Sequence, residues 1–515
     1  MAMRTIAIAG PAAVILLVVL LILPSATVVA ATETTYYVDD GITPPIRGYS
    51  GALPTSCDLR DRGLITGVKD QGLDGTCWAF ATVGVLENAM LRTGRYDAAT
   101  LALSPMQLVY TQFNDLVDPD GGLADDRITV VSNKTLMMMG GADLYESYAL
   151  ATGRGPVTAA TVPAASADLP ADFTLADEDV YMNDAVRVTG ILRLNGTDIN
   201  GMKSLVAAGY ALTLSIVYND ANVMTGNNGT VSYYDTTPDQ LDNHEVIIVG
   251  YDDGYDASQF RSAPAGDGAW LCRNSWGEEW SDGGYFWISY YGNGRSMIYT
   301  YDVAAADWCD HTYQYDGGVS THQDITYGHA GSMANVFTAQ GSERLNAASF
   351  WCLHSAGTDY TVQIYVGLTD PSDPTSGRLT ATVRGTTGFA GYQTVTLPTA
   401  VELRADETFA VTVTLTDVDE AVYLPVDTDE SEIDDFASPD PSYYYYDTGA
   451  RAGQSFVSAD GCTWEDLGAD GSSNVRVKAY TVDAADADAL SWEPLLAALL
   501  VAAGAVSLLC WSRRS

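Results

Sequence analysis

Basic residues are scarce in this chain of 515 residues. It holds 25 lysines and arginines, of which only four are lysines, against 66 aspartates and glutamates, so its formal net charge is −41. A surface with this charge repels nucleic-acid phosphates and anionic lipid headgroups, and we expect no nucleic-acid partner. The acidity suits a salty environment or cationic substrates, or it is a compositional bias of the host that aids solubility.

Cysteine and histidine are also few, at seven and five residues. Their spacing matches no zinc motif, and the aspartate clusters are too irregular to predict a calcium loop. We therefore expect no metal and no cofactor. The sequence shows no internal repeat either, which argues against a solenoid or a propeller.

Both ends of the chain are apolar. Residues 1–30 place Arg4 before a long apolar run that ends in small residues, which is typical of a secretory signal peptide. Residues 495–511 form a second apolar run, at the lower length limit for a membrane span, and the basic residues 512–515 are expected in the cytoplasm. The alternatives are an uncleaved signal anchor at the start and, at the end, a helix packed on the body or a processed sorting tail. Export with an anchor predicts the extracellular face of the cell membrane.

The first folded unit is expected at residues 53–300, after a short polar leader at 31–52. Helical periodicity comes first in this unit, and strand patterns follow. Helices are expected at residues 76–92, 104–116 and 141–153, with Thr76 and Ser104 as caps. Strands are expected at residues 186–194, 210–218, 244–252, 268–275 and 283–291. This order favours an α+β fold with a helical lobe and a β lobe.

The second unit is expected at residues 307–482, where helical periodicity is nearly lacking. Short strands separated by Gly, Asp, Pro and Ser turns predict an all-β sandwich. The aspartate-rich insert 427–447 is expected to be a surface loop, in which the run Tyr443 to Tyr446 stacks on sugar rings or fills the loop core. Residues 483–494 are expected to be a linker.

Three separated motifs carry chemistry: QGLDGTCWAF at 71–80, DNHEVIIVGYDD at 242–253 and WLCRNSWGEEWSDGGYFWISY at 270–290. A cysteine at the start of a helix lies where the helix dipole and the backbone N–H groups favour a thiolate. A neighbouring imidazolium favours it further and yields a nucleophile at neutral pH. In this order the motifs closely resemble the papain family of cysteine peptidases, with its two-lobed fold, over residues 53–291.

The resemblance implies a role for each motif residue. Cys77 is expected to be the nucleophile, and His244 its proton partner, held in orientation by Asn274. The side-chain amide of Gln71 and the backbone N–H of Cys77 are expected to stabilise the oxyanion. Trp276 is expected to shield the contact between Asn274 and His244 from water.

Four positions depart from the family pattern. Asp74 stands where the family usually has a disulfide-bonded cysteine. Glu245 follows the histidine where a small residue is commoner, so we expect it at the substrate side-chain pocket, with a weak preference for basic residues, or as a simple rim charge. Cys57 and Cys272 are atypical for their motifs, and we expect them to form a disulfide, which export makes plausible.

The second unit contains HTYQYDGG, FWCLHSAG and GYQTVTLP, and it looks like the lectin-like sandwich that follows the peptidase in some prokaryotic, secreted or membrane-anchored members of this family. This resemblance implies carbohydrate as a partner, or a scaffold that braces the peptidase. The whole predicts a cell-surface cysteine endopeptidase that hydrolyses polypeptides through an acyl-enzyme intermediate. The alternatives are a surface adhesin or carbohydrate-binding protein with a vestigial peptidase unit, and an acyl transferase (transpeptidase) that uses the same thioester.

Overall fold

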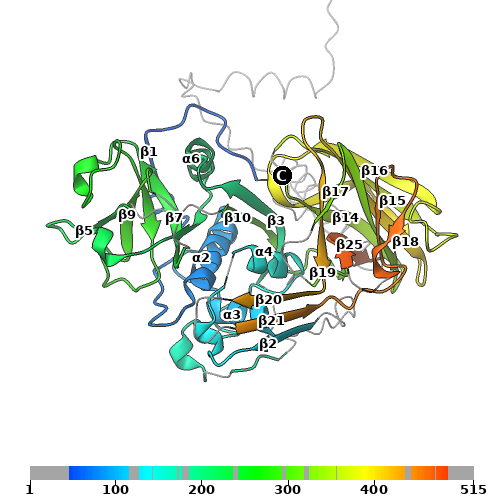
Figure 1. Ribbon diagram of the computed structural model, residues 1–515, viewed down its shortest axis with the longest axis horizontal. Helices are drawn as coiled ribbons and strands as arrows, with labels where there is room; N and C mark the ends of the chain where they lie inside the picture. Colours follow the sequence, from blue (N-terminus) through cyan, green and yellow to red (C-terminus); the bar gives the residue numbers. More distant parts are fainter. Residues whose placement is uncertain are drawn as a thin grey trace, which may run out of the picture. The chain divides into compact units, whose positions relative to one another are not determined.

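In the computed structural model, all the described residues belong to one compact unit (Figure 1). The described residues are 46–114, 127–141, 143–170, 173–176, 185–235, 242–292, 297–317, 324–354, 356–434, 442–469, 471 and 473–484. The expected signal peptide, apolar run 495–511 and basic tail lie outside these residues. Of the expected leader only residues 46–52 are described, and of the expected linker only residues 483 and 484. Within the described ranges, no helix is long and apolar enough to cross a bilayer.

The three predicted helices are all present. The α-helices are α2 (Cys77–Arg92), α3 (Pro105–Phe113), α4 (Asp143–Ala151) and α6 (Ile199–Ala208). Short 3-10 turns are η1 (Leu136–Met138), η2 (Ser166–Asp168), η3 (Asp220–Asn222), η4 (Ala257–Gln259) and η5 (Leu467–Ala469). Ser104 caps α3 as expected, because its side chain accepts a hydrogen bond from Gln107 N. The expectation for Thr76 is wrong, since its side chain makes no cap hydrogen bond to α2.

The β lobe is a sheet in the order β1-β7-β8-β9-β6-β5, with β4 also paired to β7. Its strands are β1 (Ser56–Asp58), β4 (Leu212–Ile216), β5 (Val223–Thr225), β6 (Val231–Tyr233), β7 (His244–Asp252), β8 (Ala269–Arg273) and β9 (Tyr285–Ser289). α2 packs against β7 and is buried along all of Trp78 to Leu91. Gly84 permits this packing, because a Cβ there would lie 2.2 Å from Ile247 Cδ1. The helix that Cys77 begins is thereby held on the strand that His244 begins.

The second unit is a sandwich of two larger sheets, in the orders β10-β3-β17-β14-β25-β11 and β16-β15-β18-β13-β22-β23. The strands of the first sheet are β3 (Val186–Asn195), β10 (Met297–Ala305), β11 (His311–Tyr313), β14 (Glu343–Cys352), β17 (Ala390–Leu403) and β25 (Val477–Asp483). Those of the second are β13 (Ala330–Thr338), β15 (Asp359–Val366), β16 (Arg378–Thr386), β18 (Thr408–Thr416), β22 (Ser455–Ser458) and β23 (Glu465–Asp466). Phe350 of the first sheet and Val362 and Val411 of the second belong to one buried core, as the strand pattern predicts.

The first of these sheets joins the two halves of the chain. β3 was expected in the β lobe, but it pairs instead with β10 on one side and with β17 of the sandwich on the other. Gly391 in β17 makes the second pairing possible, because its φ is +130° and a Cβ there would lie 1.9 Å from Ile191 O. Trp351 and Tyr392 of the sandwich belong to the same buried core as α2. The two halves therefore share one sheet and one core.

Two three-stranded sheets complete the fold, β12-β19-β24 and β2-β21-β20. Their strands are β12 (Asp324–Thr326), β19 (Tyr423–Thr428), β24 (Ser473–Val475), β2 (Arg127–Val131), β20 (Glu430–Asp434) and β21 (Ser442–Asp447). The second of them corrects the prediction of a surface loop at 427–447, since β21 pairs with β2 of the first unit (Figure 1). Tyr444 and Tyr446 are buried while Tyr443 and Tyr445 are exposed, so the tyrosine run is a strand with one packed face.

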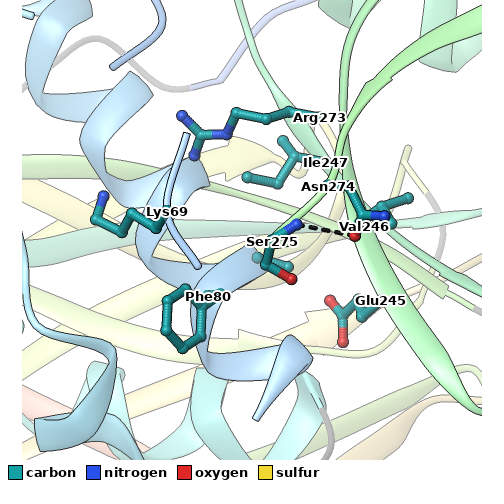
Figure 2. A pocket seen from close by; sticks show the side chains of 9 residues that line it. Lys69, Phe80, Glu245, Val246, Ile247, Arg273, Asn274 and Ser275 are labelled. Atoms are coloured by element: carbon teal, nitrogen blue, oxygen red, sulfur yellow. Dashed lines mark hydrogen bonds between the residues drawn. The ribbon is translucent and has the colours of Figure 1, made fainter. Parts of the chain in front are cut away.

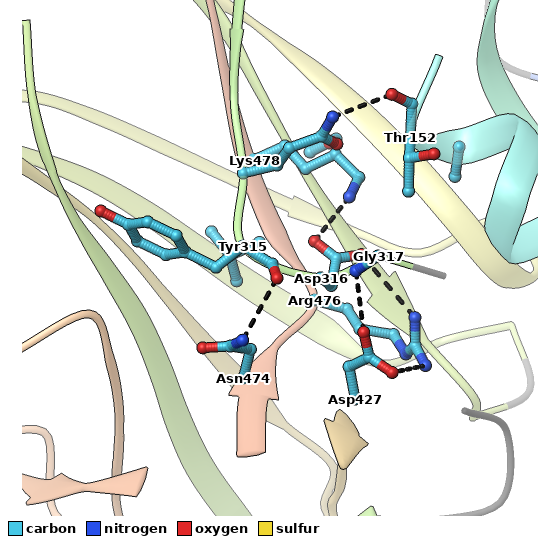
Figure 3. A network of polar contacts seen from close by, with 12 residues as sticks. Thr152, Tyr315, Asp316, Gly317, Asp427, Asn474, Arg476 and Lys478 are labelled. Carbon is cyan, nitrogen blue, oxygen red and sulfur yellow. Dashed lines mark hydrogen bonds and ion pairs between the residues drawn. The ribbon is translucent and has the colours of Figure 1, made fainter. Parts of the chain in front are cut away.

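A buried ion cluster lies at the junction between the sandwich and the helical lobe (Figure 3). Lys478 Nζ donates to Asp316 at 2.5 Å, and Arg476 Nη2 lies 3.4 Å from Asp427 Oδ1. All four side chains are at most 2% exposed. The guanidinium of Arg476 also lies 3.7 Å from the ring centre of Tyr148 in α4. The cluster is balanced in charge, as burial of four ionic groups requires, and it ties the sandwich to the helical lobe.

The expected disulfide between Cys57 and Cys272 is wrong. Cys57 lies on β1 and Cys272 on β8, and β7 runs between these strands. Strands two places apart are about 9.6 Å from each other, too far for a disulfide. Each sulfur instead contacts a backbone carbonyl, at 3.7 Å from Val206 O for Cys57 and at 3.9 Å from Trp270 O for Cys272.

Candidate active site

Cys77 is the first residue of α2 and is partly exposed. The start of a helix carries the positive end of its dipole, which favours a thiolate at this position. Residues at helical spacing from Cys77 show which way this face of α2 points. Gly84 packs on Ile247, and Ala81 borders a cavity with Glu245 and Val246. These contacts move toward the start of β7 as α2 is followed back toward Cys77, and His244 is the first residue of β7.

His244 is held by two neighbours from the segment after β8. Its Nε2 lies 2.8 Å from Asn274 Oδ1, and the ring of Trp276 stacks on the imidazole with 4.7 Å between ring centres. The exposed fraction of His244 is 7% and that of Asn274 is 3%. The ring of Trp276 therefore lies against the imidazole of this hydrogen-bonded pair, and its role as a shield from water stays a prediction.

The hydrogen bond determines which ring nitrogen of His244 carries the proton. Asn274 Oδ1 also accepts from Ser275 N at 2.8 Å, which identifies that atom as the amide oxygen. Because an amide oxygen only accepts, His244 Nε2 donates, and Nδ1 is left as the acceptor in the neutral ring. Burial lowers the pKa of His244 to about 4, and the hydrogen bond to Asn274 opposes this shift. On its own the ring is neutral at pH 7, ready to take a proton at Nδ1.

Gln71 is fixed at both ends of its amide. Its Nε2 donates to Asp74 O at 2.7 Å, and its Oε1 accepts from Ser275 Oγ at 2.5 Å. The backbone N–H of Gln71 also donates to Ser275 O at 2.8 Å. One of the two N–H bonds on Nε2 is thus directed at Asp74, and the second remains to meet an oxyanion. Asp74, at the family's cysteine position, holds this glutamine through its backbone.

Glu245 lies beside His244 on β7 and is 5% exposed, so it is not a solvated rim charge. It borders a cavity of about 10 Å³, about the size of one water site, between α2 and the β lobe. Figure 2 shows its carboxylate on the side of the cavity where Phe80 lies, away from the guanidinium of Arg273. Its part in a substrate pocket stays a prediction.

Sequence reasoning missed two residues of the site. Ser275 holds Gln71, and the only signal was its place inside the motif NSWG. Tyr218 lies edge-on to Trp276 with 4.9 Å between ring centres and edge-on to His244 at 5.9 Å. No motif surrounds Tyr218, which follows β4 and reaches the site only because β4 pairs with β7.

Comparison with known proteins agrees with this geometry. Residues 53–306 match the papain family cysteine protease domain, and residues 312–481 match the lectin like domain. The chain carries a papain-family domain followed by a lectin-like domain. This confirms the fold class, an α+β papain-like fold followed by an all-β sandwich.

The same order of domains occurs in a solved structure, that of the cysteine protease and lectin-like domains of Cwp84, a surface layer associated protein of Clostridium difficile. The two chains are 25% identical, the alignment covers 86% of this chain and 93% of the other, and the TM-score is 0.67.

Curated relatives match the papain-family domain. Cysteine endopeptidase RepA of Oryza sativa subsp. japonica is 30% identical over 45% of this chain, and cathepsin K of Mus musculus is 29% identical over 47% of it. The chain spans 51% and 64% of the length of these two relatives.

Proposed function

We propose that this chain is a cysteine endopeptidase that hydrolyses peptide bonds in polypeptides through an acyl-enzyme intermediate on Cys77. One observation carries the proposal: His244 is hydrogen-bonded to Asn274 beneath Trp276, on the strand that packs against the helix begun by Cys77. The nucleophile thus lies on an element that packs against the strand of the proton acceptor, and a third group orients that acceptor.

The steps follow from the geometry. The thiol proton passes to His244 Nδ1, and the thiolate attacks the substrate carbonyl carbon. The negative oxygen of the tetrahedral intermediate accepts hydrogen bonds from Gln71 Nε2 and from the backbone N–H of Cys77. His244 then protonates the departing amine, and later it takes a proton from the water that hydrolyses the thioester.

The electrostatics couple the two reacting groups. A buried imidazole with its pKa at about 4 does not hold a proton at neutral pH unless an anion lies beside it. The thiolate of Cys77 is that anion, so the imidazolium and the thiolate form together. The reactive ion pair is therefore a property of both residues.

The papain-family domain of this chain is proposed to act outside the cell. Residues 1–30 have the form of a secretory signal, and residues 495–511 have the composition of a C-terminal anchor. Cwp84, with the same two domains, is described as surface layer associated. Labelling of intact cells with a membrane-impermeant biotin reagent tests this, since an exported chain is labelled and an internal one is not.

Glu245 is proposed to favour basic side chains in the substrate. It lies next to His244, and its carboxylate is buried on the side of Phe80. Cleavage-site profiling of the wild type and of Glu245→Gln tests this role, because the preference for Lys and Arg is expected to weaken while overall turnover is retained.

Hydrolysis of a peptide library by the purified chain, under reducing conditions, tests the main proposal. The wild type is expected to cleave peptides, to lose this activity on Cys77→Ala, and to react with iodoacetamide at Cys77 faster than a model thiol does. If the wild type shows neither cleavage nor fast labelling, the result favours the alternative of an adhesin with a vestigial peptidase unit. Products that contain an added amine in place of water would indicate acyl transfer.

A further inference from the structure

The loop from Gln71 to Cys77, which carries both proposed oxyanion donors, projects into solvent at its middle. Leu73 is 99% exposed, and Gly72 has a φ of +65° with open space where a Cβ would lie. Burial of apolar side chains does not fix a loop of this kind. The position of the Gln71 amide therefore depends on the hydrogen bonds that hold the loop.

Asp74 makes two of these hydrogen bonds, in different directions. Its backbone oxygen accepts from Gln71 Nε2 at 2.7 Å. Its side chain binds a residue 92 positions further along the chain, because Oδ2 accepts a hydrogen bond from Ser166 Oγ. Asp74 thus connects the Gln71 amide to a separate segment of the papain-family domain.

The segment that carries Ser166 is fixed at the start of α3. Ser104, the cap of α3, binds this segment twice, since its N–H donates to Val157 O at 3.0 Å and its Oγ donates to Pro163 O at 3.1 Å. Val157 is 0% exposed and Val162 is 1% exposed, so the segment is also anchored in the core. Ser166 follows three residues after Pro163 and gives the loop a fixed point of attachment.

The direction of the Gln71 amide matters because an oxyanion donor acts only when it is aimed at the atom where negative charge develops. Ser275 holds Gln71 Oε1 and Asp74 O holds Nε2, so these two contacts together set the plane of the amide. If Asp74 moves, the second N–H of Nε2 turns with it. A misplacement of about 1 Å in a reacting site can cost up to about 10²-fold in rate.

We propose that the hydrogen bond from Ser166 to Asp74 aims the Gln71 amide at the oxyanion, which makes Asp74 and Ser166 positioning residues for the acyl-transfer steps. The inference rests on the proposed function of the same site. Asp74 acts through its backbone oxygen, and Ser166 acts through Asp74, so neither side chain needs to touch the substrate. What is required is a hydrogen-bond acceptor at position 74 and a hydroxyl at position 166, and the negative charge of Asp74 is dispensable.

Steady-state hydrolysis of a peptide substrate by the full chain tests this requirement. Asp74→Ala and Ser166→Ala are each expected to lower kcat about tenfold, with KM nearly unchanged. Asp74→Asn keeps an acceptor and Ser166→Thr keeps a hydroxyl, so each should restore kcat to within about twofold of the wild type. Thr161→Ala is the matched control, because Thr161 is exposed on the same segment and its Oγ1 pairs with Thr158 Oγ1 at 3.3 Å.

Two reagents for Cys77 separate an effect on Gln71 from a general disturbance of the site. Cys77 adds to a peptide aldehyde, with sulfur bonding to the carbonyl carbon and a proton passing to the oxygen, so the adduct places an oxygen where the oxyanion forms. The same sulfur displaces iodide from iodoacetamide, and no oxyanion forms in that reaction. Asp74→Ala and Ser166→Ala are expected to raise the aldehyde Ki about tenfold, while the rate of alkylation by iodoacetamide stays within about twofold of the wild type.

The possible results distinguish this inference from the proposed function. A wild type that hydrolyses no peptide would overturn the proposed function, and this inference with it. Hydrolysis by the wild type, with kcat and aldehyde Ki unchanged in Asp74→Ala and Ser166→Ala, would overturn this inference alone. So would an equal loss of kcat in Asp74→Asn and Asp74→Ala, which would indicate an effect of charge, or alkylation that slows in parallel with kcat. Circular dichroism confirms that each variant is folded, and Ser166→Ala, at a partly exposed position, carries the test if Asp74→Ala does not fold.

Discussion

The catalytic site and the junction between the two domains both bury polar groups, but they do so in opposite ways. The site uses groups that are neutral alone, such as the His244 imidazole, whose pKa lies at about 4. The junction buries full charges, with Asp316 and Asp427 set against Arg476 and Lys478. A reacting site must create charge during the reaction, whereas a junction must keep its charges permanently paired.

The catalytic site and the junction also differ in how far apart in the sequence their residues lie. Gln71 and Cys77 lie in one short motif, and Asn274, Ser275 and Trp276 are consecutive. The junction draws its charges from positions 316, 427, 476 and 478, and its shared sheet joins β3 to β17. The lectin-like domain is thus built into the core of the papain-family domain, and a variant at the junction should affect folding, while a variant at the site should affect chemistry.

The largest effect is expected at the site. His244→Ala removes the proton acceptor and donor, and kcat/KM for peptide hydrolysis should fall at least about 10⁴-fold. The melting temperature should change little. His311→Ala is the control, because His311 pairs with Asp483 in the sandwich and should leave kcat/KM unchanged. Retention of activity within tenfold in His244→Ala would contradict the assignment.

The junction should respond in stability. Lys478→Met leaves Asp316 buried without its closest cation, and the free energy of unfolding should fall by about 3–5 kcal/mol. Arg344→Met is the matched control, because the pair of Arg344 with Glu402 is exposed and contributes only about 0–1 kcal/mol. Urea unfolding measures both, and equal stabilities of the two variants would refute a structural role for the cluster.

Gln71→Ala should cost less than the loss of His244. Removal of one oxyanion donor lowers kcat about 10²–10³-fold, with KM nearly unchanged. Ser275→Ala removes only the group that holds Gln71 Oε1, so it should lower kcat about tenfold. Steady-state kinetics separates the two, and a fall in kcat for Ser275→Ala as large as for Gln71→Ala would show that Ser275 does more than position Gln71.

The smallest of these effects is expected in β21. Tyr444 is buried and lies 6.0 Å from Phe113 between ring centres, so Tyr444→Ser should destabilise the fold by about 2 kcal/mol. Tyr445→Ser changes an exposed ring on the same strand and should shift stability by no more than about 0.5 kcal/mol. If Tyr445→Ser reduces stability as much as Tyr444→Ser, β21 does not pack as described.

The parts of the fold that depend on local pattern could be predicted from the sequence. The bounds of β7 agree with the expected strand, and α2 begins one residue after its expected start. The site motifs were recognisable because the chemistry constrains residues that lie close together in the chain.

The features that depend on distant partners could not be predicted. The pattern of β3 indicates a strand, but nothing in it specifies β17 as the neighbour. Four consecutive tyrosines conceal the alternation of β21, whose partner β2 lies some 300 positions earlier. A disulfide between Cys57 and Cys272 was predicted only because both cysteines are unusual for their motifs. Strand β7 lies between their strands and keeps the two cysteines apart.

The central claim is that His244 is protonated at neutral pH only because Cys77 supplies a thiolate. NMR titration of the histidine rings, of which the chain has five, tests it in the wild type and in Cys77→Ala. The account predicts that His244 carries a proton at pH 7 in the wild type, whereas in Cys77→Ala it stays neutral down to a pH of about 4. Identical titration of His244 in the two proteins would contradict the account.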